Sequence, residues 1–480
     1  MKKLLSNFKY VLMNQVLLML MPFITAPHIA RTLGPNGIGV NAYISSVVNL
    51  FALFSVLSIP VYGIRQIAQC ENKKDRSKVF FSIYFIQLIM SISILIFFVV
   101  YMMFQNEHQQ LFLIYILHLL AMVFDVTWFF NGREQVKKVA VRNMWIKVIG
   151  AALIFLFVRN NNDLDIFIWI SVSVILLGQL VLWIPLRKEI KFEKIRISDV
   201  TIHIVPISIL FLPQLLTKVY MLVNGVILGN ISGTTELGFY NHANMIIQMA
   251  LGIVSSISIV MLPRMSMEFA KGNIDNFKKF AQDALQFVFF LSIPMMLGLI
   301  AITSNFVAWF FGPEFAPVSS LSMIIAPKII FVGMANVLGI QILVATNQQN
   351  KYLVSIGVAS LLSLAINLSL VYSFGAMATA LALVAAEGIG VVIQFFYTKK
   401  FLNLKFILRE LMKYSTGGIL MYLSINLISE TINTTALLLT IIQVIVGIIV
   451  YLSFLLIMKD SFLLKIFALM RLKSNVKSYL

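Results

Sequence analysis

Three lysines lie inside long apolar segments of the sequence: Lys147, Lys218 and Lys328. Charged side chains are costly in hydrocarbon and mark functional sites by default. Lys218 lies about 15 Å before the end of its segment at Leu228, at 1.5 Å per helical residue, which is about half of a ~30 Å hydrocarbon core. Lys328, just after Pro327, lies at a similar depth. Each of these two can attract an anion as a point charge, or pair structurally with a buried carboxylate.

Acidic and imidazole side chains in the apolar segments are the candidate partners. Glu387 is predicted to pair with a lysine or to take up a coupling proton, and a purely structural ion pair is the alternative. His118 and Asp125 lie seven residues apart in one predicted span and so share a face, which allows a proton relay, although a histidine within a helix often only hydrogen-bonds to a neighbour. Lys147 is about one turn into its segment, so we expect it to snorkel to the interface.

Two further residues have the chemistry to meet a polar substrate. Arg31 is predicted to lie in a short outer loop, where it would touch headgroups as they emerge, while turn geometry explains the nearby glycines Gly34, Gly37 and Gly39. Trp128 is predicted to belong to the interfacial belt of aromatic residues rather than to a sugar-stacking platform.

The elements that position these residues are membrane-spanning helices. Of the 480 residues, 60% are hydrophobic and 12% are charged, whereas a soluble domain has roughly 25% charged residues. The composition therefore predicts an all-α polytopic membrane protein with about 14 spans. The apolar runs are 10–30, 40–63, 79–104, 111–131, 143–158, 166–186, 203–229, 237–262, 283–303, 317–345, 352–373, 376–396, 415–429 and 436–458.

The net charge of +18 is explained by topology rather than by nucleic-acid binding. With these spans, 32 of the 37 lysine and arginine residues fall in loops and tails on one side. Because basic residues accumulate in cytoplasmic loops, both termini are predicted to be cytoplasmic. The single cysteine, Cys70, excludes an intramolecular disulfide or a cysteine metal cluster, and the first apolar run is interpreted as a retained span.

The chain contains an internal repeat. Leu33-Gly34 matches Leu228-Gly229 at an offset of 195, and Gly39 matches Gly238 at an offset of 199. Two six-helix halves of this kind have the same orientation and are related by an axis along the membrane normal. We therefore expect an N-terminal lobe over 1–200 and a C-terminal lobe over 201–398, with a working cavity between them. The remainder, 399–480, is predicted to hold an interfacial amphipathic segment, two extra spans and a cytoplasmic tail.

Several segments resemble Wzx-type oligosaccharide flippases, a family within the multidrug/oligosaccharidyl-lipid/polysaccharide exporter superfamily of fourteen-span transporters. The resemblance extends over most of the first twelve spans. The matching segments are Pro27–Gly39, Trp128–Glu134, Arg142-Asn143 with Lys147, Leu228–Tyr240, Leu262–Arg264, Phe311–Glu314 and Ala385–Glu387. The sequence departs from the family after Tyr220, because Asn224 stands where an acidic residue is often found.

The resemblance implies a flippase that moves undecaprenyl-diphosphate-linked oligosaccharide repeat units across the bacterial plasma membrane, from the inner to the outer leaflet. These units feed capsule, exopolysaccharide or O-antigen synthesis. Lys218, Lys328 and Arg31 would then bind the substrate in a cationic cavity. The two lobes around this cavity would move the substrate by alternating access. Membrane lipids surround the protein, a polysaccharide polymerase and glycosyltransferases are candidate partners, and a monomer suffices. No cofactor or metal is expected, and coupling to a proton or sodium gradient is left open.

Three other classes of protein are alternatives to this function. An enzyme would need a catalytic constellation, and the sequence contains no metal-binding pattern, nucleophile motif or phosphate-cradling glycine loop. A drug/cation antiporter of the same fold is expected to concentrate acidic residues within its spans, whereas here lysines outnumber them. A peptidoglycan-precursor flippase remains an alternative within the superfamily.

Overall fold

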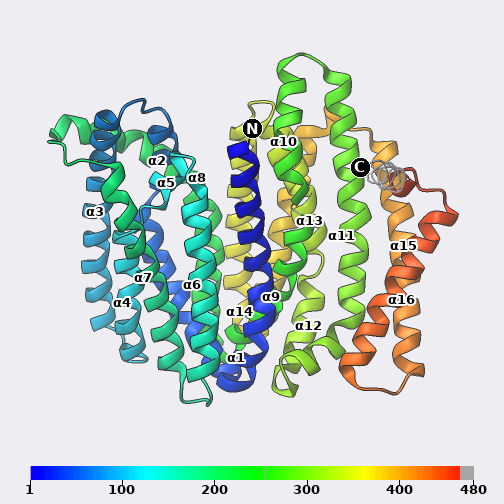
Figure 1. Ribbon diagram of the computed structural model, residues 1–480. Coiled ribbons are helices and arrows are strands. Elements are labelled where there is room, and N and C mark those ends of the chain that lie inside the picture. Colours follow the sequence, from blue (N-terminus) through cyan, green and yellow to red (C-terminus); the bar gives the residue numbers. More distant parts are fainter. Residues whose placement is uncertain (1, 255, 465–480) are drawn as a thin grey trace. The chain divides into compact units, whose positions relative to one another are not determined.

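The computed structural model describes residues 2–254 and 256–464, and in this part of the chain all regular elements are helical (Figure 1). The chain forms two compact units, unit 1 over Met1–Gly238 and unit 2 over Phe239–Leu480. The predicted tail beyond residue 464 lies outside the described residues. Each unit has its own packed interior, and the candidate residues are distributed between the two.

Unit 1 contains eight helices and the start of a ninth, α9, which continues into unit 2. Gly34, with φ of 66°, interrupts α1 and separates two helices there, which is the conformation that glycine adopts without a steric penalty. The helices are α1 Lys2–Val56, α2 Ile59–Ala68, α3 Lys73–Met103, α4 Gln109–Val123, α5 Thr127–Gly132, α6 Val136–Phe157, α7 Leu164–Glu189, α8 Ile197–Ile231 and α9 Thr234–Val254.

Unit 2 contains the rest of α9 and the remaining helices. Its longest helix, α14, is interrupted at Gly375, where φ is 51°. The helices are α10 Ser256–Ala270, α11 Ile274–Phe310, η1 Pro313–Phe315, α12 Ala316–Ile325, α13 Lys328–Ala335, the π-helix η2 Asn336–Val344, α14 Gln349–Thr398, η3 Lys399–Phe401, α15 Leu404–Thr431 and α16 Ala436–Ile457.

The described helices include nine that are long and apolar enough to cross a membrane, and the pair Pro313–Ile325 and Lys328–Val344, bent by 43°, makes a tenth. Two of the nine, α1 and α14, each contain two crossings separated by a glycine. The less apolar helices α9–α10 and α15 complete the predicted series of fourteen. The all-α polytopic fold class is confirmed.

The basic loops that were predicted to share one side lie together in unit 1. Lys73 Nζ donates a hydrogen bond of 2.7 Å to the carbonyl oxygen of Lys188, and Lys138 Nζ lies 3.6 Å from Glu189 Oε1. These contacts join the start of α3, the start of α6 and the end of α7. Exposed ion pairs contribute little stability, so their value here is that they locate three predicted cytoplasmic loops at one end of unit 1.

Trp128 belongs to the interior of unit 1, and the prediction of an interfacial position is wrong. Its side chain is 1% exposed and stacks on Phe80 with a ring-centroid distance of 5.4 Å. Its indole Nε1 donates to Gln87 Oε1 at 3.1 Å, and its ring occupies the space left by Gly63 on α2. The missing Cβ of a residue distant in sequence creates this site.

The two glycines that define the internal repeat make reciprocal contacts within unit 1. A Cβ on Gly39 would overlap the carbonyl oxygen of Thr234, and a Cβ on Gly238 would overlap the carbonyl oxygen of Pro35. The repeat offset of 199 that relates Gly39 to Gly238 also relates Pro35 to Thr234. Both contacts join the segment of α1 after Gly34 to the start of α9, and at each contact a glycine admits the backbone of the other segment.

Replacing Gly39 by alanine is expected to destabilise the protein by about 1–3 kcal/mol, because the backbone around Thr234 must move to admit the methyl group. Gly357 on α14 is the matched control, since no described heavy atom lies within 4 Å of a Cβ placed there. Thermal unfolding of the purified variants in one detergent measures the difference. Equal melting temperatures for G39A and G357A would contradict the close approach.

Candidate functional site

Lys328 is placed by the bend between α12 and α13. Pro327 precedes it and has no N–H to donate to the preceding turn, and α13 begins at Lys328. The Lys328 side chain is 2% exposed, and its Nζ donates to Asn244 Oδ1 of α9 at 3.1 Å. An ammonium group has three donors. The site is therefore a buried cation held by an amide.

The second charged group of this site comes from α14. The half-buried Glu387 carboxylate interacts electrostatically with the Lys328 ammonium group, and also with the phenols of Tyr240 and Tyr352. We call Lys328, Asn244, Glu387 and Tyr240 the unit 2 polar site. The structure thus brings two of the candidates, Lys328 and Glu387, into one region, while their roles in binding or coupling stay predictions.

A π-helix adjoins this site. The η2 segment Asn336–Val344 follows α13 directly, and segments of this kind occur frequently at functional sites. Gly339 in η2 lies against the ring of Tyr352 and the side-chain oxygen of Gln394. The hydropathy of the predicted span 317–345 gave no sign of this change in helix type, because a π-helix and an α-helix have the same apolar composition.

The candidate cations of unit 1 have exposed side chains. Lys218 lies on α8 and is exposed. Arg31 is also exposed, but it lies within the helical part of α1 before Gly34, so the prediction of a loop position is wrong. Lys147 is exposed on α6, as snorkelling requires, and Asn224 is 1% exposed.

His118 and Asp125 do not lie on one helix, which corrects the predicted shared face. Helix α4 ends at Val123, and Asp125 lies in the break before α5. Its Oδ1 accepts hydrogen bonds from Thr127 N at 2.9 Å and Thr127 Oγ1 at 2.6 Å. The His118 ring contacts the Tyr115 ring at 6.3 Å. The Asp125 carboxylate therefore accepts the hydrogen bond of the first backbone N–H group of α5.

Unit 2 contains a buried charge cluster that was not predicted from the sequence. Glu410 and Asp460 are each 2% exposed, and Lys413 Nζ pairs with both carboxylates. Gln286 of α11 donates to Glu410 Oε2 at 2.9 Å, and Tyr414 OH donates to Asp460 Oδ2 at 3.1 Å. The cluster fastens α15 and the end of α16 to α11, which packs beside both helices in Figure 1.

The segment that begins at residue 399 was predicted to lie at the membrane interface, separate from the span that follows it, and this prediction is wrong. From Leu404 onward it is the first part of the continuous helix Leu404–Thr431, and its residues Ile407 and Glu410 are buried. One feature of the sequence could have indicated this burial: Glu410 is an acidic residue within a strongly basic stretch.

Two titratable groups in the connecting segments have shifted pKa values. Burial raises the pKa of the Cys70 thiol, and the Asp75 carboxylate raises it further. The pKa of Asp163 is lowered, because its carboxylate accepts backbone hydrogen bonds from Arg159 and Asn160 at 2.8 and 2.9 Å. Both groups belong to unit 1.

Comparison with known proteins identifies the family. Residues 4–269 match the model of a family described as polysaccharide biosynthesis protein, which is more than half of the chain. The chain belongs to this family. The resemblance to Wzx-type flippases of the multidrug/oligosaccharidyl-lipid/polysaccharide exporter superfamily is confirmed, and the protein is a multi-pass membrane transporter rather than an enzyme.

Individual relatives agree with this assignment. A protein of Escherichia coli (strain K12) named "Putative O-antigen transporter" is 24% identical over 377 residues, which cover 77% of this chain and 90% of that protein. A lipid II flippase, MurJ, in an inward closed conformation has the same fold, with a TM-score of 0.74 at 18% identity over 95% of this chain and 99% of that one. A multidrug resistance MATE transporter is similar at a TM-score of 0.55 and 14% identity, over 81% and 94% of the two chains.

Proposed function

We propose that this protein is a flippase for undecaprenyl-diphosphate-linked oligosaccharide repeat units. It moves them from the cytoplasmic to the outer leaflet of the bacterial plasma membrane, where they supply capsule, exopolysaccharide or O-antigen synthesis. The proposal rests on membership of the polysaccharide biosynthesis protein family and on the relative named for O-antigen transport. A lipid-linked oligosaccharide combines a long apolar chain with an anionic diphosphate, which is the chemistry that a cation inside a membrane-crossing unit suits.

The observation that carries the proposal is the burial of Lys328. A 2% exposed ammonium group with an amide at 3.1 Å lies among helices that are long enough to cross a membrane. Such a group is expensive to desolvate and is kept where its charge is used. Lys328 in unit 2 and Lys218 in unit 1 would each present a cation to the diphosphate or to an acidic sugar during alternating access.

Energy coupling is proposed for Glu387. A carboxylate beside a buried lysine can take up a proton or a sodium ion, and its neutralisation would change the charge of the unit 2 polar site by one unit. In this scheme the protein needs no organic cofactor, and a proton or sodium gradient drives the return step.

Deletion of the gene tests the function in the producing bacterium. We expect lipid-linked repeat units to accumulate at the inner leaflet while surface polysaccharide is lost, with wild-type protein restoring both. Unchanged repeat units together with altered drug tolerance would instead indicate an antiporter, and accumulation of the peptidoglycan precursor would indicate a precursor flippase. Either of these two results would contradict the proposal.

The single cysteine tests the proposed orientation with cytoplasmic termini. Cys70 lies between α2 and α3, in a loop predicted to be cytoplasmic, so a membrane-permeant maleimide should label it in intact cells and an impermeant one should not. Labelling will be slow near neutral pH, because the pKa of the thiol is raised by burial and the thiolate is the reactive form.

A matched control for this labelling places the cysteine on the opposite side. In a C70S background, Asn161→Cys lies in the exposed loop between α6 and α7, and the impermeant reagent should label it. Labelling of Cys70 by the impermeant reagent would reverse the proposed orientation.

A further inference from the structure

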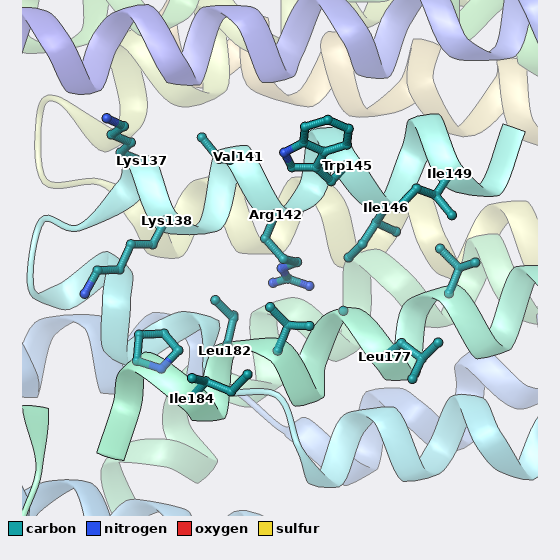
Figure 2. A pocket seen from close by; sticks show the side chains of 14 residues that line it. Lys137, Lys138, Val141, Arg142, Trp145, Ile146, Ile149, Leu177, Leu182 and Ile184 are labelled. Carbon is teal, nitrogen blue, oxygen red and sulfur yellow. The ribbon is translucent and has the colours of Figure 1, made fainter. Parts of the chain in front are cut away.

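A groove between α6 and α7 in unit 1 has no part in the function proposed above. Its volume is about 870 Å³, and Figure 2 shows the side chains that line it. Three of these are cations, Lys137, Lys138 and Arg142, and the others are almost all apolar. The two lysines lie at the end of the groove where α6 begins, which is the predicted cytoplasmic end. The groove is therefore charged at one end and apolar along its length.

Arg142 is the deepest of the three cations. It lies about 9 Å along α6 from Val136, at 1.5 Å per residue, and in Figure 2 its guanidinium group reaches from α6 toward α7. Gly178 of α7 leaves the space for this, because a Cβ there would overlap Ile146 and lie 3.4 Å from Arg142 Cδ. Its buried Nε atom has no hydrogen-bond partner in the described part of the chain.

The charges around Arg142 leave it short of a direct partner. The Asp125 carboxylate interacts with it electrostatically, but the Oδ1 of Asp125 already accepts two hydrogen bonds from Thr127. Lys138 lies 3.6 Å from Glu189 Oε1, and Lys137 Nζ lies 4.9 Å from the centroid of the Tyr10 ring. A guanidinium group with an unused N–H, about one turn of α6 away from two lysines, is suited to a phosphate.

The apolar part of the groove is open. Trp145, Ile149 and Leu177 line it and are 63%, 50% and 60% exposed. Large apolar side chains on membrane-crossing helices are covered by hydrocarbon chains, and tryptophan is typical of the interfacial level where chain and headgroup meet. The order from cations through tryptophan to aliphatic side chains matches the order from headgroup to acyl chain in a lipid.

We propose that this groove binds an anionic phospholipid of the cytoplasmic leaflet, with its phosphate on Arg142, the rest of its headgroup toward Lys137 and Lys138, and an acyl chain along Trp145, Ile149 and Leu177. Basic pockets between membrane helices on the cytoplasmic side bind cardiolipin headgroups in this way. The groove belongs wholly to unit 1 and includes neither Lys218 nor Lys328. These features favour a bilayer phospholipid over the prenyl diphosphate of the substrate.

Titration of cardiolipin into the purified full-length chain in a neutral detergent, read by native mass spectrometry, tests the proposal. We expect the wild type to retain cardiolipin and to bind phosphatidylcholine far more weakly. R142Q should weaken cardiolipin binding by about tenfold or more, because it removes a charge-assisted contact to phosphate. K147Q is the matched control, since it removes an exposed positive charge from α6 outside the groove, and its affinity should equal that of the wild type.

A second variant keeps the test decisive if R142Q does not fold. The surface pair K137Q and K138Q should weaken cardiolipin binding by about fivefold for each lysine. The proposal would be overturned if R142Q, or the double variant K137Q/K138Q, bound cardiolipin with the same affinity as the wild type and K147Q. So would a wild type that does not prefer cardiolipin to phosphatidylcholine, or one that binds undecaprenyl diphosphate through Arg142 while ignoring cardiolipin.

Discussion

Replacing Lys328 by methionine is expected to lower surface polysaccharide export by about 10- to 100-fold, the value of one charge-assisted hydrogen bond of about 1.5–3 kcal/mol. Methionine fills a similar volume in the apolar surroundings, so the main loss is the positive charge. Export is measured as surface polysaccharide per cell after normalising to the amount of protein in the membrane. K328R, which keeps the charge, should retain part of the activity.

Lys351 provides the matched control for this substitution. Its side chain is exposed and its Nζ donates to Gln348 Oε1 at 2.7 Å, so K351M removes a lysine charge without touching the unit 2 polar site. We expect wild-type export from K351M. Wild-type export from K328M would refute a substrate role for Lys328.

The double variant K328M/E387Q separates a binding role from a structural ion pair. If Lys328 only neutralises Glu387, the double variant should export as much as the single variant E387Q, since buried ion pairs can often be replaced by uncharged groups without loss of stability. If Lys328 binds the substrate, export should fall below that of E387Q while the melting temperature recovers. The account predicts the second result.

The largest expected effect on stability comes from Lys413. In K413M the buried Glu410 and Asp460 lose the cation that they share, and breaking a buried ion pair in this way costs about 3–5 kcal/mol. Thermal unfolding in detergent should show a correspondingly large decrease in melting temperature. K405M, an exposed position on the same helix, should unfold like the wild type.

A second substitution tests the cause of this loss. In K413M/D460N the Asp460 carboxylate, which has lost its ion pair with Lys413, becomes a neutral amide, while Glu410 keeps its ion pair with Arg409 at 3.0 Å; this change should recover part of the lost stability. If the single variant K413M is as stable as K405M, the buried ion pairs of Lys413 do not stabilise the fold. A double variant less stable than K413M would show that the carboxylate of Asp460 is stabilised by groups other than Lys413.

The spans were predictable from sequence because their signal is local. Each needs about 20 apolar residues bounded by polar ones, and Gly34, placed in a turn by its neighbours, does break α1. The position of Lys328 along its span follows in the same way from counting residues, but its burial does not, because Lys218 at a similar counted depth is exposed.

The remaining features depend on partners that are distant in sequence. Trp128 is buried because Gly63 leaves space for its ring, and Glu410 is buried because Gln286 and Lys413 satisfy its carboxylate. Hydropathy describes single segments and contains neither relation. The break at Asp125 was different, because an aspartate near the start of a helix is a local signal, which the apolar run obscured.

The central claim is tested most directly by reconstitution. The purified chain is placed in phospholipid vesicles with a fluorescent undecaprenyl-diphosphate-linked oligosaccharide, and a membrane-impermeant quencher reports the fraction of label in the outer leaflet over time. The account predicts rapid exchange between leaflets with the wild type, slow exchange with K328M, and wild-type exchange with K351M. Exchange no faster than in protein-free vesicles, under either a proton or a sodium gradient, would contradict it.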